Sequence, residues 1–443
     1  MTAVSEDGFG KVPRDWKHST LGGVAKFQTG GTPSRNEPRY WENGDIPWVK
    51  TAEIDYRVID VTQEKITRLG LESSSTKVFP AGTLLVAMYG QGVTRGRAGI
   101  LGIDAATNQA CAAITPHDEN EILTRFVYFF LQYQYEALRQ MGHGANQRNL
   151  NMALLRGFPI AYPPLSEQRR IAGVLGLVQR AVEQQERLRT LVAELKQTLL
   201  HHLFTHGLRG EPQKPTDLGP IPQSWELRPC DELCEMISVG VVVRPASHYV
   251  PSGVPAFRSF NVREDRLNPS DLVYFSEETN NTKLAKSKLR KGDVLVVRTG
   301  YPGTSCVVPD EYDGANCIDL VIVRPKQALV RSGFLSRFFN TPAGKRQAVA
   351  AKHGLAQQHL NVAAVKRTQI PVPSLEEQTE IDAAMATVQR KLALIESRKI
   401  ALTSLFRTLL HQLMTAQLRV SDLDVESLLS PAVPDSSRRL VSH

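Results

Sequence analysis

The sequence QRNLNMALLRGFPIAYPPLSEQ, Gln147 to Gln168, occurs a second time as QQHLNVAAVKRTQIPVPSLEEQ, Gln357 to Gln378, and the two copies align without a gap. Each copy reads as a loop, a short apolar strand, a proline turn and the start of a helix. A constant offset of 210 relates many positions of the two copies, among them Gly144 and Gly354, Leu150 and Leu360, Asn151 and Asn361, Pro163 and Pro373, and Ile171 and Ile381. The chain therefore builds the same corner twice.

The similarity extends over the rest of each half of the chain. Downstream, LLHHLFTHGLR from Leu199 matches LLHQLMTAQLR from Leu409 at the same offset. Upstream the offset slips by one or two, and the matched segments are VPRDW from Val12 and IPQSW from Ile221, DIPWVKTAEI from Asp45 and GVPAFRSFNV from Gly253, and AGTLLVAMYG from Ala81 and KGDVLVVRTG from Lys291. Solenoid repeats run about 20 to 50 residues, so this much longer period indicates a duplicated domain.

Bulk properties place the chain among globular proteins. Its 443 residues predict two to four domains, and its 42% hydrophobic and 22% charged residues are near globular averages. The net charge of +8 favours a polyanionic partner, because basic surface releases the condensed counterions of nucleic acid. A mildly basic protein without such a partner is the alternative.

The cysteines and the N-terminus bear on the compartment. Five cysteines without paired CxxC spacing predict neither a disulfide framework nor a zinc ribbon; they are Cys111, Cys230, Cys234, Cys306 and Cys317. No stretch resembles a signal peptide or a membrane span. We therefore expect a cytoplasmic location.

Each half predicts an α+β domain. Apolar runs bounded by turn residues predict strands at Leu84 to Met88, Val294 to Val297, Cys111 to Thr115 and Leu320 to Val323. Helical spacing covers Glu121 to Met141 and Phe334 to Lys352, and Pro342 predicts a break or a new start in the second.

Two heptad patterns follow the repeated corner. The first runs Ile171, Val174, Val178, Ala181, Gln185, Leu188, Val192, Leu195 and Leu199, and the second runs Ile381, Ala384, Val388, Ile395, Leu402, Leu405 and Leu409. Each helix of about 35 to 40 residues would be about 55 to 60 Å long. Neither can bury its stripe alone, so the pattern favours an antiparallel pair around a pseudo-two-fold axis; two core helices of an ordinary bundle are the alternative. Ser374 with Glu377 predicts a capping box for the second helix, and Ser166 is the expected cap of the first.

These patterns divide the chain into seven segments. We expect a flexible N-terminus at 1–11, a first globular domain at 12–164, a long helix at 165–206, a linker at 207–220, a second globular domain at 221–373, a second long helix at 374–418 and a disordered tail at 419–443. Two similar heads at a fixed spacing suit two half-sites on one face of DNA.

At this point the sequence resembles the specificity (S) subunit of type I restriction-modification enzymes. The resemblance rests on the IPxxW element, GDIPWVKTAEI from Gly44, TNQACAAI from Thr107, the Q-x-x-LN element, and PPLSEQRRI or PSLEEQTEI before a long helix. It covers nearly the whole chain, and the order and duplication of these elements make it specific.

The resemblance implies a non-catalytic subunit that reads DNA. Each target-recognition domain would read one half of a bipartite, asymmetric target, and the helices would set the spacer and dock two methyltransferase (modification) subunits. Those partners would use S-adenosylmethionine, and restriction or translocase subunits would join them with ATP and magnesium. No cofactor is expected on this chain.

Motifs for independent catalysis are not found in the sequence. NEPRY from Asn36 departs from the Asn/Asp-Pro-Pro-aromatic element of amino-methyltransferases, and GQGVTRG from Gly90 fits a hairpin or DNA-facing loop better than a nucleotide cradle. There is no GxxxxGK[ST], and PDEYDG from Pro309 has no acidic-x-Lys partner of a nuclease site. His201, His202 and His206 are interpreted as helix-surface residues rather than metal ligands.

Candidate DNA-binding residues are polar or basic residues at matching places in both halves, because Arg, Lys, Asn and Gln read base edges. In the first half they are Lys50, Thr51, Tyr89, Gln91, Thr94, Arg95, Arg97, Asn108, Gln147, Arg148 and Asn149. In the second half they are Arg258, Ser259, Asn261, Arg298, Thr299, Tyr301, Asn316, Gln357, Gln358 and His359. Since the two sets differ, the two half-sites are expected to differ. Three other functions remain open: a self-sufficient methylating enzyme, a coiled-coil adaptor that binds only protein, and a ligand-binding β-rich protein.

Overall fold

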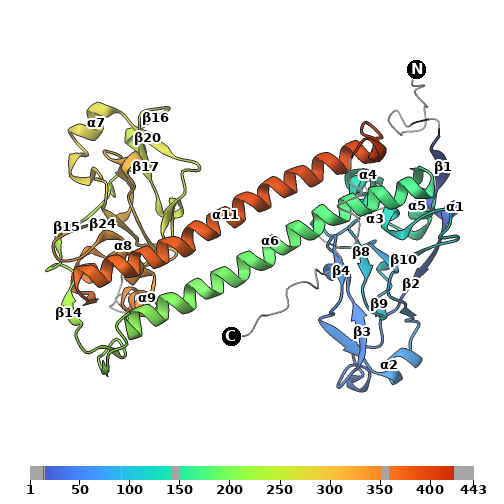
Figure 1. Cartoon of the computed structure of the whole chain (residues 1–443), viewed down its shortest axis with the longest axis horizontal. Coiled ribbons are helices and arrows are strands. Elements are labelled where there is room, and N and C mark those ends of the chain that lie inside the picture. The colour runs from blue at the N-terminus through green and yellow to red at the C-terminus, as the bar shows by residue number, and fades with distance from the viewer. Residues whose placement is uncertain (1–12, 14, 91, 142–149, 351–358, 424–443) are drawn as a thin grey trace, which may run out of the picture. The chain divides into compact units, whose positions relative to one another are not determined.

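The computed structural model describes residues 13, 15–90, 92–141, 150–350 and 359–423. The chain divides into two compact units. Unit 1 combines the residues up to Gln184 with those from Lys399, and unit 2 is Gln185–Arg398. Each unit therefore contains one α+β head and one half of each long helix, α6 (Leu165–His206) and α11 (Leu375–Met414) (Figure 1). Since the start of α6 shares a unit with the end of α11, the two helices are antiparallel.

Head 1, the part of unit 1 outside α6 and α11, is built from two sheets and short helices. One sheet has the order β2 (Ala25–Thr29), β10 (Cys111–Pro116), β7 (Leu84–Ala87), β8 (Ala98–Leu101) and β4 (Val58–Ile59). The other has the order β5 (Glu64–Ile66), β3 (Ile46–Val49), β9 (Ala105–Thr107) and β6 (Val78–Phe79), and β1 (Lys17–Thr20) pairs with β11 (Pro159–Tyr162). The helices are α1 (Leu21–Val24), α2 (Arg68–Glu72), α3 (Thr124–Tyr133), α4 (Tyr135–Met141) and α5 (Met152–Gly157).

Head 2, the part of unit 2 outside the long helices, follows a similar plan. Its first sheet is β15 (Cys234–Val239), β24 (Leu320–Pro325), β21 (Val294–Val297) and β22 (Ser305–Val307), and its second is β16 (Tyr249–Val250), β20 (Val273–Phe275), β17 (Val254–Phe257) and β23 (Asn316–Cys317). Two-stranded pairs are β14 (Glu226–Pro229) with β25 (Gln369–Val372), β18 (Val262–Arg263) with β19 (Arg266–Leu267), and β12 (Gln213–Lys214) with β13 (Ile221–Pro222). The helices are α7 (Glu277–Asn281), α8 (Ser332–Asn340), α9 (Pro342–Ala350) and α10 (Val362–Arg367).

The strands β7 and β21 are buried along their whole length because both of their faces are covered. Leu84 and Val86 belong to the core that contains the aromatic residues of α3, whereas Leu85 belongs to the core between the two sheets. In head 2, Val294 faces the core of α8 and Leu295 faces the core between the sheets. Continuous apolar runs are typical of such strands, and the predicted strands are confirmed.

The predicted helices of the heads differ in detail. The expected helix from Glu121 begins at Thr124 and is interrupted at Gln134, where α3 ends. In head 2, α8 ends before Thr341 and Pro342 starts α9. The prediction of a fresh start at this proline is confirmed, since proline fits the first turn of a helix, where its missing N–H is not needed.

The repeated corner is held by one buried glutamine in each unit. Gln168 accepts a hydrogen bond from the Leu123 N–H at 2.9 Å and donates to the Glu121 and Pro163 carbonyls, both at 2.9 Å. Gln378 repeats the three bonds with the Arg331 N–H at 2.8 Å, the Leu329 carbonyl at 3.1 Å and the Pro373 carbonyl at 3.0 Å. Both glutamines are fully buried. Each long helix is thus fixed to its head within its first turn.

The asparagine of the repeated LN pair starts a short helix. Asn151 accepts from the Leu154 N–H at 2.9 Å, and Asn361 accepts from the Ala364 N–H at 2.8 Å. Both asparagines are N-caps, which satisfy backbone donors that a helix start leaves unpaired. The motif is therefore structural at this position.

The predicted caps of the long helices are partly wrong. Ser374 accepts from the Glu377 N–H at 3.3 Å, but the Glu377 carboxylate accepts from Leu208 N–H at 2.7 Å and from the Trp225 indole at 3.2 Å. The second half of the capping box therefore anchors the segment after α6. Ser166 lies inside α6, which begins at Leu165, and so is not its cap.

The buried side of the long helices follows the predicted heptad seam except at three leucines. Leu195 and Leu405 are 56% and 46% exposed, and the next residues, Lys196 and Phe406, are buried instead. Leu188 is also exposed. On the turns of Leu195 and Leu405 the next residue packs on its head instead, since Lys196 pairs with Asp265 and Phe406 packs on Phe129. None of the described helices is long and apolar enough to cross a membrane.

The first residues after α11 are ordered, in contrast to the expected disordered tail. Arg419 forms ion pairs with Asp15 at 2.8 Å and Glu167 at 2.7 Å, and Val420 is buried. Arg419 lowers the pKa of Asp15, whereas burial raises the pKa of Glu167 against the opposing effect of Arg419. In unit 2 the residue 210 positions earlier, Arg209, likewise pairs with acidic residues at the start of α11.

Thiol reagents are expected to react slowly with all five cysteines of the native protein. After denaturation, all five are expected to react rapidly. Every cysteine is free and buried. Burial raises the pKa of Cys111, Cys306 and Cys317, so little reactive thiolate is present. Counting thiols with a chromogenic disulfide at pH 8, before and after denaturation, checks this; rapid reaction of one native thiol would contradict it.

Candidate nucleic-acid interface

A parallel strand pair brings several predicted residues of head 1 to one edge. Val49 of β3 is paired with Thr107 of β9, and the Asn108 N–H donates to the Val49 carbonyl at 3.2 Å. Since parallel strands end at the same edge of a sheet, Lys50 and Asn108 leave the sheet together. The Met88 N–H also donates to the Ala110 carbonyl at 2.8 Å, which brings the loop after β7 to this edge.

Head 2 repeats this arrangement with β17, β23 and β21. Phe257 is paired with Cys317, and the Ile318 N–H donates to the Phe257 carbonyl at 2.8 Å. Val297, the last residue of β21, is paired with Leu320. Arg258 therefore follows β17 as Lys50 follows β3 in head 1, and Arg298 follows β21 as Met88 follows β7.

In head 2 the structure assembles a polar cluster, which we call the Asp319 cluster: Arg298, Thr299, Asp319 and His359. Arg298 forms an ion pair with Asp319 and donates to the Leu360 carbonyl at 2.9 Å. Thr299 Oγ1 and His359 Nδ1 are hydrogen-bonded at 2.7 Å. The Arg298 side chain is only 16% exposed, so it positions the loops. Thr299 and His359 are exposed on the surface of the cluster.

Tyr301 lies in the same loop as the Asp319 cluster and is 78% exposed. Its N–H donates to the Thr299 carbonyl at 3.2 Å, and its carbonyl accepts from Thr304 at 3.2 Å. An exposed aromatic side chain on a tight loop, beside a histidine and a threonine, offers both stacking and hydrogen bonds to a nucleic acid. Sequence-based prediction therefore chose four residues here, Arg298, Thr299, Tyr301 and His359, that lie together.

In head 1 the equivalent loop is tied to α4. Tyr135 Oη donates to the Val93 carbonyl at 2.5 Å, and Arg139 donates to the Gly92 carbonyl at 3.0 Å. Arg95 in turn donates to the Arg139 carbonyl at 3.4 Å. Gly92 has a φ of +62°, which favours glycine in this turn. The loop connects the antiparallel strands β7 and β8, as expected for a hairpin.

The exposures along this loop separate its candidates. Tyr89 is 41% exposed, whereas Thr94 and Arg95 are half-buried. Arg97 forms an ion pair with Asp55 and has a 25% exposed side chain. Tyr89 is therefore the most accessible described candidate of this loop, and Arg97 is held by its carboxylate partner.

A second polar group of head 1 surrounds Glu64. Lys50 Nζ lies 2.8 Å and Arg35 Nη1 lies 2.7 Å from this carboxylate. Both cations lower the pKa of Glu64, Lys50 having the larger effect. The Arg35 guanidinium also lies over the ring of Trp41, 3.6 Å from its centroid. Arg35 was missed by sequence reasoning, although a basic residue close to two tryptophans, Trp41 and Trp48, is a usable signal.

The corresponding group in head 2 surrounds Arg258. Its guanidinium lies 4.5 Å from the centroid of the Phe260 ring and donates to the Asp271 carbonyl. Ser259 and Thr51 are both half-buried, at the starts of equivalent 3-10 turns. Each head thus places a cation and an aromatic ring beside the end of the equivalent strand, but the residues that do so differ.

Two predicted asparagines lie inside head 2 and cannot meet DNA there. Asn261 is fully buried; it accepts from the Arg258 N–H at 2.8 Å and donates to the carbonyls of Asn268 and Ser270. Asn316 is also fully buried and donates to Asn280 Oδ1 at 2.7 Å. Their amides satisfy buried backbone groups, and they fix the shape of the loops.

Asn108 and the remaining candidates complete the comparison. Asn108 is half-buried and accepts from the Ala110 N–H at 3.0 Å, so it caps its own turn. Six predicted residues lie outside the described residues: Gln91, Gln147, Arg148, Asn149, Gln357 and Gln358.

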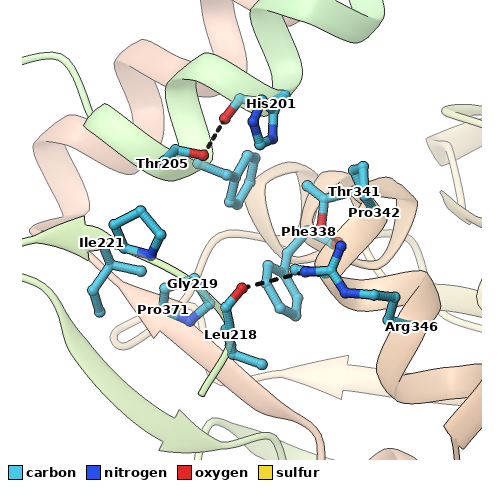
Figure 2. Close-up of a pocket in the computed structure, with 13 residues that line it drawn as sticks. His201, Thr205, Leu218, Gly219, Ile221, Phe338, Thr341, Pro342, Arg346 and Pro371 are labelled. Atoms are coloured by element: carbon cyan, nitrogen blue, oxygen red, sulfur yellow. Dashed lines mark hydrogen bonds between the residues drawn. The ribbon is translucent and has the colours of Figure 1, made fainter. Parts of the chain in front are cut away.

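The cavity of about 240 Å³ drawn in Figure 2 offers no catalytic constellation. It lies in unit 2 between the end of α6, the segment before β13 and the start of α9. Its walls are mostly apolar, including Phe204, Phe338 and Pro371, and Arg346 donates to the Leu218 carbonyl at 3.3 Å. Over the described ranges, no three histidine, cysteine or acidic residues gather as a metal site.

These features define a class of protein: an internally duplicated α+β chain with two similar polar interfaces, each joined to a shared pair of antiparallel helices. A family model described as the type I restriction modification DNA specificity domain matches residues 13–191 and again 222–404. The chain therefore belongs to this family and carries two copies of its domain.

Individual relatives agree with the family assignment. The type I restriction enzyme MjaIX specificity subunit of Methanocaldococcus jannaschii is 21% identical over 95% of this chain and 98% of its own length. The EcoR124I/EcoR124II specificity subunit of Escherichia coli is 29% identical over 36% of this chain, a match that spans 40% of that relative. A crystal structure of the S subunit from M. genitalium superposes with a TM-score of 0.60 at 15% identity, covering 93% of this chain and 99% of that one. The fold is shared with that subunit.

Proposed function

We propose that this chain is the DNA-reading subunit of a type I restriction-modification complex, in which each head reads one half of a bipartite, asymmetric target. The observation that carries the proposal is the repetition of one strand-end interface with different side chains. Lys50 is replaced by Arg258, and Tyr89 by Thr299, at matching positions. Sequence is read at base edges by such groups, so two unlike half-sites follow.

The long helices would set the spacing between the half-sites and dock the methyltransferase subunits. Continuous helices of 42 and 40 residues are about 60 Å long. Leu188, Leu191 and Leu195 are exposed on the unit 2 part of α6, at an i, i+3, i+7 spacing that places them on one face. An exposed apolar stripe of this kind suits a protein partner.

Chemistry would come from the partner subunits. The relatives are specificity subunits, and in head 2 the Arg298 guanidinium holds the loops through its bond to the Leu360 carbonyl. S-adenosylmethionine for methylation of adenine, and ATP with magnesium for translocation and cleavage, would bind to those partners. We place the complex in the cytoplasm, where DNA is accessible.

Mapping methylated adenines after co-expression with the neighbouring methyltransferase tests this function. The expected result is methylation at one asymmetric, bipartite motif, and no methyl transfer by the purified chain alone. A coiled-coil adaptor that binds only protein is the alternative, since exposed leucines on α6 would serve it equally. Complex formation without protection of any defined DNA site would favour the adaptor and overturn the proposal.

A further inference from the structure

One turn in each head lies against the long helices of its own unit. In unit 1 it is the turn at Tyr56 and in unit 2 the turn at Asp265, both with positive φ, +47° and +62°. The Tyr56 N–H donates to the Ala98 carbonyl at 2.9 Å, and the Asp265 N–H donates to the Ser305 carbonyl at 3.1 Å. Ala98 and Ser305 each begin the second strand of the central hairpin. The two turns are therefore equivalent.

In unit 1 this turn is hydrogen-bonded to α6, and α11 contributes an aromatic residue, Phe406, to the same cavity. Gln179 of α6 donates to the Tyr56 carbonyl at 2.6 Å and to Tyr128 Oη at 2.9 Å. Phe406 of α11 is buried and packs on Phe129, with ring centroids 6.1 Å apart. The ion pair described for this turn, between Asp55 and Arg97, lies within head 1.

In unit 2 the same contact is ionic. Lys196 Nζ lies 2.6 Å from Asp265 Oδ2, and the two side chains are only 8% and 7% exposed. Lys196 also donates to Gln389 at 3.0 Å, and Asn340 donates to Asp265 at 3.2 Å. By the offset of 210, Gln389 is the counterpart of Gln179, and Lys196 is the counterpart of Phe406. The glutamine is retained, whereas the residue opposite the turn changes from phenylalanine to lysine.

A second position changes in the same sense. Arg337 of α8 is buried and forms an ion pair with Asp382 of α11. The equivalent bonds of Gln168 to Leu123 and of Gln378 to Arg331 align α3 with α8 in sequence, and in this alignment Phe129 is the counterpart of Arg337. Asp382 corresponds to Ala172. Two ion pairs in unit 2 thus stand where unit 1 has aromatic residues and an alanine; Lys196 and Asp265 are both buried, whereas Asp382 is 38% exposed beside the buried Arg337.

We propose that each end of the helix pair is selective for its own head. The part that carries Lys196 and Asp382 accepts head 2, and the part that carries Phe406 and Ala172 accepts head 1. With head 2 on the unit 1 part, the Asp265 carboxylate would face Phe406 and lose its buried partner. Buried unpaired charges are strongly destabilising, and such repulsive contacts are how proteins reject the wrong partner. These four helix residues determine which head occupies which end, and their effect does not depend on DNA recognition.

The test is one substitution measured in two contexts. Phe406→Lys is made in the parent chain and in a full-length chimera in which residues 222–373 replace residues 13–164. In the chimera, Gln179 is already placed to accept from the new amine as Gln389 does from Lys196. The substitution is expected to lower the Tm of the parent by roughly 5–10 °C and to raise that of the chimera. Adding Ala172→Asp should raise the chimera further. The same sign in both chains would overturn the proposal, because a merely structural role for Phe406 does not depend on the head.

A second measurement uses the parent chain alone and holds even if the chimera does not fold. Lys196→Met and Asp265→Asn should each lower the Tm by roughly 5–10 °C, and the double variant should lose clearly less than their sum. Lys345→Met is the matched control, because its ion pair with Glu264 is 38% and 29% exposed and should matter little. Additive losses would show that Lys196 and Asp265 are not coupled and would overturn the proposal.

Discussion

Inserting one heptad into each long helix, after Gln184 in α6 and after Arg398 in α11, is expected to abolish methylation of the parental DNA target. Seven helical residues add about 10.5 Å, which is close to three base pairs of DNA. Three base pairs also rotate the second half-site by roughly 100° around the DNA axis, whereas a heptad rotates a helix by only about 20°. The two heads would then face different sides of the duplex, and methylation should fall by at least about 100-fold.

A longer insertion should restore the rotational alignment of the two heads on DNA. Three heptads add about 31.5 Å, or about nine base pairs, which is nearly one full turn of DNA. This longer variant is expected to regain methylation at a target whose spacer is longer by nine or ten base pairs. Sequencing of methylated adenines in cells that express each variant with the methyltransferase measures both spacer and order. A control replaces seven residues at the same places without changing the length. An unchanged spacer length after a clean insertion would show that the helices do not set the distance between the half-sites.

The elements of the fold that could be predicted from sequence are those fixed by local rules. The repeated corner was predictable because its prolines, its strand and its helix start recur at one offset, and the buried Gln168 explains why the motif is needed twice. The antiparallel helices were predictable because neither could bury its stripe alone. The burial of Lys196 and Phe406 was not predictable, since their partners, Asp265 and Phe129, lie far away in the sequence.

The candidate interface was predictable as a set of loops but not as a set of accessible atoms. Matching polar residues after matching strands identified the Asp319 cluster, because strand ends gather at one edge. Residue type alone does not distinguish a base-reading amide from one that satisfies a buried backbone. Asn261 and Asn316 have side chains of a type that reads bases, but both are buried and anchor loops. Arg35 was missed because its partners, Trp41 and Glu64, are recognised only in three dimensions.

Replacing Thr299, Tyr301 and His359 together by alanine is expected to weaken binding to the target by about 100-fold or more and to relax selectivity in only one of its halves. Tyr301 is 78% exposed, and the other two residues, both exposed, form one hydrogen-bonded pair. Good base contacts contribute about 1–3 kcal/mol each, so the loss of two such contacts is sufficient. Arg298 is left in place, because its bonds to Leu360 and Asp319 hold the loops.

A competition assay with duplexes that carry every single substitution in the target separates reading from general attraction. If these residues contact bases, mismatches in one half should cost less for the variant than for the parent, while mismatches in the other half keep their full cost. If they contact only phosphates, all duplexes should weaken equally and the salt dependence should become shallower. Tyr249→Ala is the matched control, an exposed aromatic residue on β16 outside the cluster. Tyr89→Ala should relax the opposite half. Because the two heads carry equivalent interfaces, a triple variant of head 2 that altered both halves equally would contradict independent reading by each head.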